Sequence, residues 1–178
     1  MKVVVLCHKE LMPTAKFISS LAMTRQQFQY NRHRLENSSW RTEGYVGTSL
    51  RRLGHQVRYV GIDNDFQPLL DVIKCERPDV IFNLVEEFSG EALLEPFVVN
   101  FLELSGVPFT GNSSLGLLLA KNKAAAKVLL TSAKVRVPRS TRNFPQIVKY
   151  ASEESSRGIT DQSVVANRKE RLRALARP

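Results

Sequence analysis

Lys2-Val3-Val4-Val5-Leu6-Cys7 (KVVVLC) opens the chain with an unbroken apolar run after a single lysine. A strand with one face in water alternates apolar and polar residues, whereas a strand covered on both faces is apolar throughout. The run therefore predicts a central strand of a parallel sheet. It stops at His8, which is too early for a secretory signal, and we expect a cytoplasmic protein.

The residues that follow alternate between strand and helix patterns. Further strands are expected at 56–62 and 79–84, and a short strand and turn at 106–111. Helices are expected at 42–53, 66–75, 92–104, 114–121 and 123–132, with a short helix around 15–23. Over the first ~110 residues this alternation is typical of an α/β fold, in which helices cover both faces of a parallel sheet.

The helix expected at 42–53 has an apolar stripe at helical spacing. Gly54 follows as a C-cap, while Gly44 and Gly47 each weaken the helix by about 1 kcal/mol relative to alanine. The residues expected to face the core are Tyr45, Val46, Ser49, Leu50 and Leu53.

Length and composition allow one domain, or one domain and part of another. The chain has 178 residues, of which 43% are hydrophobic, and no run approaches the ~20 apolar residues that span a bilayer. The two cysteines, Cys7 and Cys75, have no metal-type spacing, and we expect both to be reduced core residues.

The net charge of +9 raises nucleic-acid binding as an alternative function. The charge is unevenly placed, however, because the segment 61–103 is acidic and the basic excess lies on either side of it. The basic run after Lys121 lacks the interleaved aromatic residues that a stacking platform needs. We therefore do not expect a nucleic-acid partner.

Polar residues follow the strand expected at 79–84, namely Asn83 and then Glu86-Glu87. The carboxyl ends of parallel strands are where open α/β sheets place ligands. Glu86-Glu87 has two interpretations, a solvated charge pair or a pair that binds an amine. Motifs for a P-loop, a dinucleotide site, a zinc protease and a serine hydrolase are absent from the sequence, and we expect no metal ligands.

A lysine followed by a Ser/Gly-rich loop stands at 144–158, in the sequence FPQIVKYASEESSRG. Lys149 is expected on a short strand at 146–150, where it would supply a fixed positive charge. The loop would supply N–H and hydroxyl donors to a phosphate. The alternative is a surface loop with a solvated lysine. A strand at 163–165 and a basic helix at 168–176 follow.

Several segments, taken in order, resemble the D-alanine–D-alanine ligase-like branch of the ATP-grasp family. The resemblance runs from about Trp40 to Ile159. The segments that carry it are Trp40-Arg41-Thr42-Glu43, Phe82-Asn83-Leu84, Gly106-Val107-Pro108-Phe109-Thr110-Gly111, Asn122-Lys123-Ala124-Ala125-Ala126-Lys127, and the stretch VKYASEESSRG at 148–158.

This resemblance implies an ATP-dependent ligase that activates a carboxylate as an acyl phosphate, which an amine then attacks. Glu43 and Ser155 would be catalytic, with Glu43 near the amino group of the first substrate. ATP would be bound by Lys123, Lys149, Glu153, Ser156 and Gly158. Magnesium is implied by the family, but the family's magnesium carboxylates and adenine pocket lie beyond the length of this chain.

The sequence also departs from the family pattern, at Tyr150, Glu154, Asn122 and Glu86-Glu87. These departures argue against D-alanine as the substrate. The resemblance implies a Rossmann-like pre-ATP-grasp domain at 1–120, a connector at 121–143, and an incomplete ATP-grasp domain at 144–178.

We expect little or no activity from this chain alone. The expected partner is a small amino-acid-like substrate, with no membrane and with a homodimer as the candidate assembly. The alternative function is a non-catalytic α/β module that binds a small ligand or a partner.

Overall fold

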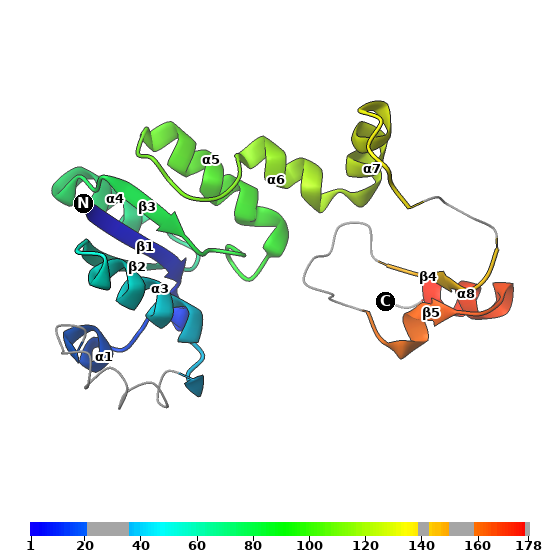
Figure 1. Ribbon diagram of the computed structural model, residues 1–178, viewed down its shortest axis with the longest axis horizontal. Helices are drawn as coiled ribbons and strands as arrows, with labels where there is room; N and C mark the ends of the chain where they lie inside the picture. Colours follow the sequence, from blue (N-terminus) through cyan, green and yellow to red (C-terminus); the bar gives the residue numbers. More distant parts are fainter. Residues whose placement is uncertain (21–35, 139–142, 150–158, 177–178) are drawn as a thin grey trace. The chain divides into compact units, whose positions relative to one another are not determined.

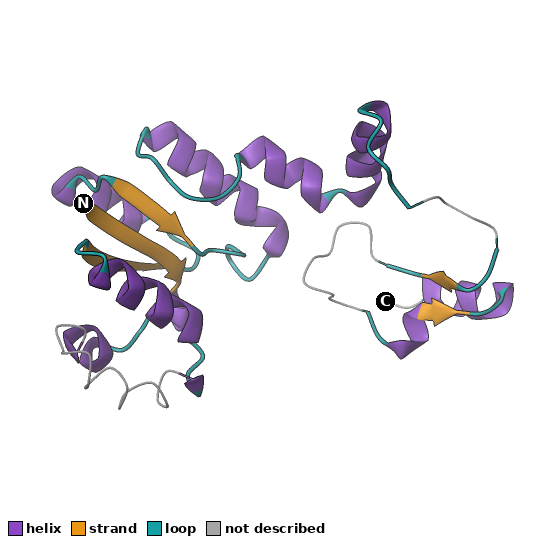
Figure 2. Cartoon of the chain, in the orientation of Figure 1, coloured by secondary structure: helices purple, strands orange, loops and turns teal. Residues whose placement is uncertain are grey.

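The central strand predicted at the start of the chain is present in the computed structural model, which describes residues 1–20, 36–138, 143–149 and 159–176. Three strands form a parallel sheet in the order β2-β1-β3: β1 (Lys2–His8), β2 (Gln56–Ile62) and β3 (Val80–Asn83) (Figure 2). The residues from Val3 to Cys7 are each at most 3% exposed. This double coverage explains why the run has no polar position.

Helices cover both faces of this sheet, as Figure 1 shows. On one face, Val4 and Leu6 of β1 share a core cluster with side chains of α4 (Gln67–Glu76) and α5 (Glu95–Ser105). On the other face, α3 (Arg41–Arg52) contacts β1 and β2. The α/β class with a parallel sheet, predicted from the alternating pattern, is confirmed.

The buried face of α3 differs from the one predicted. Ser49 and Leu53 are exposed, and the buried positions of the helix include Gly44, Gly47 and Thr48. A Cβ at Gly47 would overlap Tyr59 Oη and lie 2.5 Å from Tyr59 Cζ. The prediction that the apolar stripe faces the core was wrong, because the small residues let α3 approach the sheet closely.

The chain returns to the sheet after α5. Gly106 ends this helix with a φ of 71°, in the left-handed region that favours glycine. Ile81 N–H then donates to the Pro108 carbonyl at 2.8 Å, and Thr110 N–H donates to the Ile81 carbonyl at 3.0 Å. The strand expected at 106–111 is thereby reduced to a single parallel bridge between Ile81 and Phe109.

The remaining elements are short. Near the start of the chain are η1 (Lys9–Leu11) and α1 (Ala15–Ser20), and η2 (Ala92–Leu94) precedes α5. After α5 come α6 (Ser114–Lys121), α7 (Lys123–Ser132), β4 (Gln146–Ile147), η3 (Asp161–Ser163), β5 (Val164–Val165) and α8 (Arg168–Leu175). β4 and β5 pair antiparallel.

The chain divides into two units, Met1–Ser114 and Leu115–Pro178. In the second unit, the buried side chains among the described residues are Lys121, Ser163 and Val165. The domain boundaries predicted from the resemblance stay a prediction, because they rest on function as well as on packing.

The two cysteines differ in burial. Cys7 and Cys75 are both free thiols, but Cys75 is exposed, so its assignment to the core was wrong. It is the second-last residue of α4. Within the described residues, none of the helices is both long enough and apolar enough to cross a membrane.

Candidate functional site: the carboxyl edge of the sheet

The order β2-β1-β3 places a topological switch point at β1, because the chain leaves β1 toward one neighbour and returns to the other. Ligands of open α/β sheets bind outside the carboxyl ends of the strands at such a point. His8 ends β1, Asp63 directly follows β2, and Glu86-Glu87 follows β3. We call these residues, together with Glu43 at the start of α3, the carboxyl edge.

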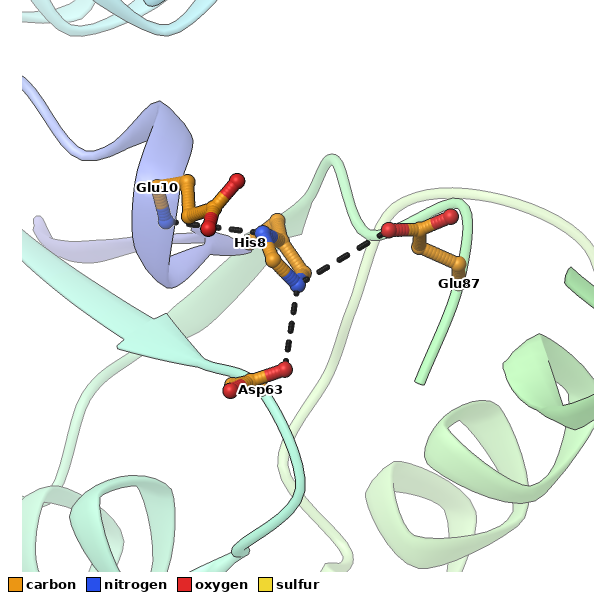
Figure 3. Close-up of polar contacts among 4 residues, drawn as sticks. All are labelled: His8, Glu10, Asp63 and Glu87. Carbon is orange, nitrogen blue, oxygen red and sulfur yellow. Dashed lines mark hydrogen bonds and ion pairs between the residues drawn. The ribbon is translucent and has the colours of Figure 1, made fainter. Parts of the chain in front are cut away.

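His8 joins the ends of all three strands (Figure 3). Its Nε2 lies 3.3 Å from Asp63 Oδ1 and 3.8 Å from Glu87 Oε1. The Glu10 backbone N–H donates to His8 Nδ1 at 3.4 Å, so the proton of the imidazole faces the two carboxylates from Nε2. The His8 side chain is only 13% exposed.

The loop after β3 is held in place by aromatic packing. Phe88 stacks on Phe66 with a centroid distance of 4.5 Å, and Phe66 stacks on Phe101 at 4.7 Å. The Ser89 N–H donates to the Asp63 carbonyl at 2.8 Å, which fastens this loop to the end of β2. Glu86 and Glu87 are therefore presented by a supported loop.

Glu43 lies in the first turn of α3 and is 4% exposed. Its Oε2 has no hydrogen-bond partner among the described residues. Burial raises the pKa of the Glu43 carboxyl, and the charge of Glu86 raises it further, while a hydrogen bond from its own backbone N–H lowers it. The site thus favours the protonated form of this carboxyl more than water does.

Cys7 and Tyr59 are two buried groups that interact with Glu43. Burial, followed by the negative charge of Glu43, raises the pKa of the Cys7 thiol to about 12. The pKa of Tyr59 is also raised, mainly by burial, and its hydroxyl donates to the Glu43 carbonyl at 3.1 Å. Both groups therefore keep their protons at neutral pH.

The predicted ATP-binding lysines lie in the second unit. Lys123 is the first residue of α7, as predicted, and Asn122 caps this helix by accepting from the Ala125 N–H at 3.0 Å. Lys149 is exposed and follows β4 without being part of it, so its placement on a strand was wrong. The Val148 N–H still donates to the Ser163 carbonyl at 2.8 Å, which ties this segment to its neighbour.

The other predicted ATP-binding and catalytic residues, Glu153, Ser155, Ser156 and Gly158, lie outside the described residues. Glu43 belongs to the first unit, and Lys123 and Lys149 belong to the second. The roles assigned to all seven residues therefore stay predictions. Within the described ranges, no group of three or more His, Cys, Asp or Glu side chains could hold a metal ion, so these residues do not fit a magnesium site.

Sequence reasoning missed the contact of His8 with Asp63 and Glu87. From the sequence, His8 is only the residue at which the first apolar run stops, and Asp63 has no assigned role. The available signal was position, because each residue stands at the carboxyl end of an expected parallel strand. Because the expected strands are parallel, their carboxyl ends lie at one edge of the sheet, and this predicts that the three residues lie close together.

A cavity of about 440 Å³ lies at the opposite, amino edge of the sheet. It is lined by Lys2, Arg58, Cys75 and Pro78 among others. Arg58 Nε lies 3.5 Å from Glu76 Oε1, and Lys2 Nζ donates to the Glu76 carbonyl at 3.3 Å. Both of these cations are thus held at the end of α4, away from the carboxyl edge.

Comparison with known proteins shows which proteins the chain is similar to. It is 32% identical over 133 residues to a D-alanine–D-alanine ligase of Paramagnetospirillum magneticum, covering 68% of this chain and 43% of the relative. It is 31% identical over 100 residues to the D-alanine–D-alanine ligase of Azorhizobium caulinodans, covering 56% and 31%. An uncharacterized protein of Sinorhizobium fredii, y4sG, is 35% identical over 130 residues, covering 64% and 38%. No family model matches the chain.

The fold defines the class first: an α/β protein with a parallel sheet whose polar residues gather at the carboxyl edge. Within that class, the resemblance predicted from the sequence is confirmed, because the chain is homologous to the D-alanine–D-alanine ligases over about two thirds of its length. The chain spans less than half the length of these relatives.

Proposed function

We propose that the chain is part of the machinery of an ATP-dependent carboxylate–amine ligase of the ATP-grasp type. The observation that carries this proposal is the similarity to several D-alanine–D-alanine ligases, which covers between 56% and 68% of the chain. In such a ligase, ATP would activate a carboxylate as an acyl phosphate for attack by an amine. The substrates would be small and amino-acid-like, and the reaction would be cytoplasmic.

In this proposal Lys123 and Lys149 contact the phosphates of ATP, and the loop that contains Ser155 and Ser156 covers them. The exposure of both lysines is compatible with such contact. Glu43 would lie near the amino group of a substrate. The chain alone would turn over slowly or not at all, because the described residues include no group that could hold magnesium.

Nucleotide titration tests the proposal. Calorimetry with ATP·Mg and ADP should detect binding in the micromolar range. Lys149→Ala should weaken it about tenfold, because a hydrogen bond to a charged group contributes about 1.5–3 kcal/mol. Lys169→Ala removes an exposed lysine of α8 and serves as the matched control.

An assay of phosphate release with added amino acids tests the expectation that the chain alone has little or no activity. Release that depends on Lys149 would contradict the expectation of little activity. Strong, salt-sensitive binding of oligonucleotides without nucleotide binding would sink the ligase proposal altogether. A non-catalytic binding module is the second candidate, and the carboxylates gathered at the carboxyl edge favour it.

A further inference from the structure

The carboxyl edge carries more negative charge than its described neighbours neutralise. Four carboxylates gather there, belonging to Glu43, Asp63, Glu86 and Glu87. The imidazole of His8 contacts two of them, and within the described ranges no lysine or arginine forms an ion pair with any of the four. Like charges in a partly buried setting repel one another, so this edge attracts cations.

Glu43 is an independent sign of a ligand. This residue is only 4% exposed, and its Oε2 has no hydrogen-bond partner among the described residues. It interacts electrostatically with Glu86 of the loop that follows β3. A buried acceptor without a donor costs about 1–3 kcal/mol. A ligand N–H group that reached Oε2 would recover this cost.

The arrangement of the carboxylates favours an organic cation over a metal ion. In the part of the chain that the structure describes, no three His, Cys, Asp or Glu side chains converge closely enough to share a metal. Asp63 and Glu87 both contact His8, whereas the charge of Glu86 acts on the carboxyl of Glu43. Two pairs of carboxylates suit a molecule with two positive charges.

The α-ammonium group of a neutral amino acid such as alanine offers only one positive charge, which its own carboxylate balances. We propose that the carboxyl edge binds a small molecule with a second cationic group, a dibasic amino acid or a diamine. One cationic group would meet Glu43 and Glu86, and the other would meet Asp63 and Glu87. That this molecule is the amine-bearing substrate rests on the proposed function, but its binding does not.

The test compares ligands of equal shape and different charge. The full chain, without nucleotide, is titrated by calorimetry and thermal-shift assay with D- and L-lysine and with D- and L-norleucine, which have the same carbon chain without the ε-ammonium group. We expect one lysine enantiomer to bind at least about tenfold more tightly than norleucine. Equal affinities, or no lysine binding at the highest soluble concentration, would overturn the proposal.

Variants of the edge test its location. Glu86→Gln and Glu87→Gln keep the size of the side chain and should each weaken lysine binding about fivefold or more. Asp71→Asn makes the same change of charge on the exposed surface of α4 and should leave binding unchanged. Thermal unfolding of each variant without ligand separates lost binding from lost folding. Equal weakening by Asp71→Asn would show only a long-range charge effect and would contradict the site.

Two further results distinguish this inference from the proposed function. Stabilisation by Mg²⁺ or Ca²⁺ alone that matches the effect of lysine would overturn the organic-cation site. Lysine binding in a chain that binds no nucleotide would leave the site standing while the ligase proposal failed. Nucleotide binding with no preference for lysine over norleucine would support the ligase proposal and overturn the site for a dibasic molecule.

Discussion

At the scale of single residues, Cys7 and Cys75 show how position sets reactivity. Cys7 is fully buried in β1 with a pKa raised to about 12, so only about one thiol in ten thousand is ionised at pH 8. Cys75 lies exposed near the end of α4. We expect Ellman's reagent to modify one thiol rapidly in the native protein and two after denaturation.

Cys75→Ser should remove the rapid phase of this reaction. The residual Cys7 should react at least about a hundredfold more slowly, because it needs both ionisation and exposure. Equal rates for the two thiols in the native protein would show that β1 is accessible, against the burial seen here.

Glu43 predicts a dependence of stability on pH. Burial raises the folded-state pKa of this carboxyl above its ordinary value, so the stabilisation it gives is full below the ordinary value and is lost as pH rises through the folded pKa. Glu43→Gln removes this loss. Relative to the wild type, the free energy of unfolding of this variant should therefore increase between pH 4 and pH 8.

Urea denaturation at the two pH values measures this difference. Asp71→Asn, on an exposed helix position, should change the free energy of unfolding by less than about 0.5 kcal/mol at either pH. The opposite result, a Glu43→Gln variant that becomes less stable relative to the wild type as pH rises, would show that a partner stabilises ionised Glu43.

At the scale of elements, the contact between α3 and β2 depends on the absence of a side chain at Gly47. A methyl group there would overlap the buried Tyr59 side chain. Gly47→Ala should therefore destabilise the protein by about 1–3 kcal/mol, although alanine favours a helix. The same substitution in a Tyr59→Phe background should cost less, because the nearest atom is gone.

Chemical denaturation of the four proteins in this double-mutant cycle gives the coupling energy. Ser49→Ala, on the exposed side of α3, is the control and should stay within about 0.5 kcal/mol of the wild type. Equal costs of Gly47→Ala in both backgrounds would mean that Tyr59 moves aside freely.

Most elements could be predicted from the sequence because their signals are local. The continuous run of β1 and the strand at Gln56–Ile62 are visible in neighbouring residues. The buried face of α3 is not, because the need for glycine at position 47 comes from Tyr59 on another element. The contact of His8 with Asp63 and Glu87 likewise depends on strand order, which no single segment encodes.

At the scale of the whole molecule, charge and burial both separate the two units. Residues 115–178 hold 14 of the 26 lysines and arginines but only 4 of the 17 aspartates and glutamates. The same stretch includes many exposed large apolar side chains, among them Val128 of α7 and Leu172 of α8. Self-repulsion and sparse burial both weaken the second unit.

The protection of amides from hydrogen exchange should therefore differ between the two units. Amides of β1 and its neighbours should exchange through global unfolding, which for a domain costs about 5–15 kcal/mol. Amides of α7 and α8 should exchange through local opening at a small fraction of that free energy. Mass spectrometry of peptides measures the difference, and protection of α7 equal to that of β1 would contradict it.

The close approach of α3 to the sheet also has an evolutionary consequence. Because the Gly47 backbone and the Tyr59 ring occupy adjoining space, neither position can drift alone. Homologues with a larger residue at position 47 should carry a smaller one at position 59, and those that keep the tyrosine should keep the glycine. The two positions, 12 apart in sequence, are expected to covary as a pair among homologues.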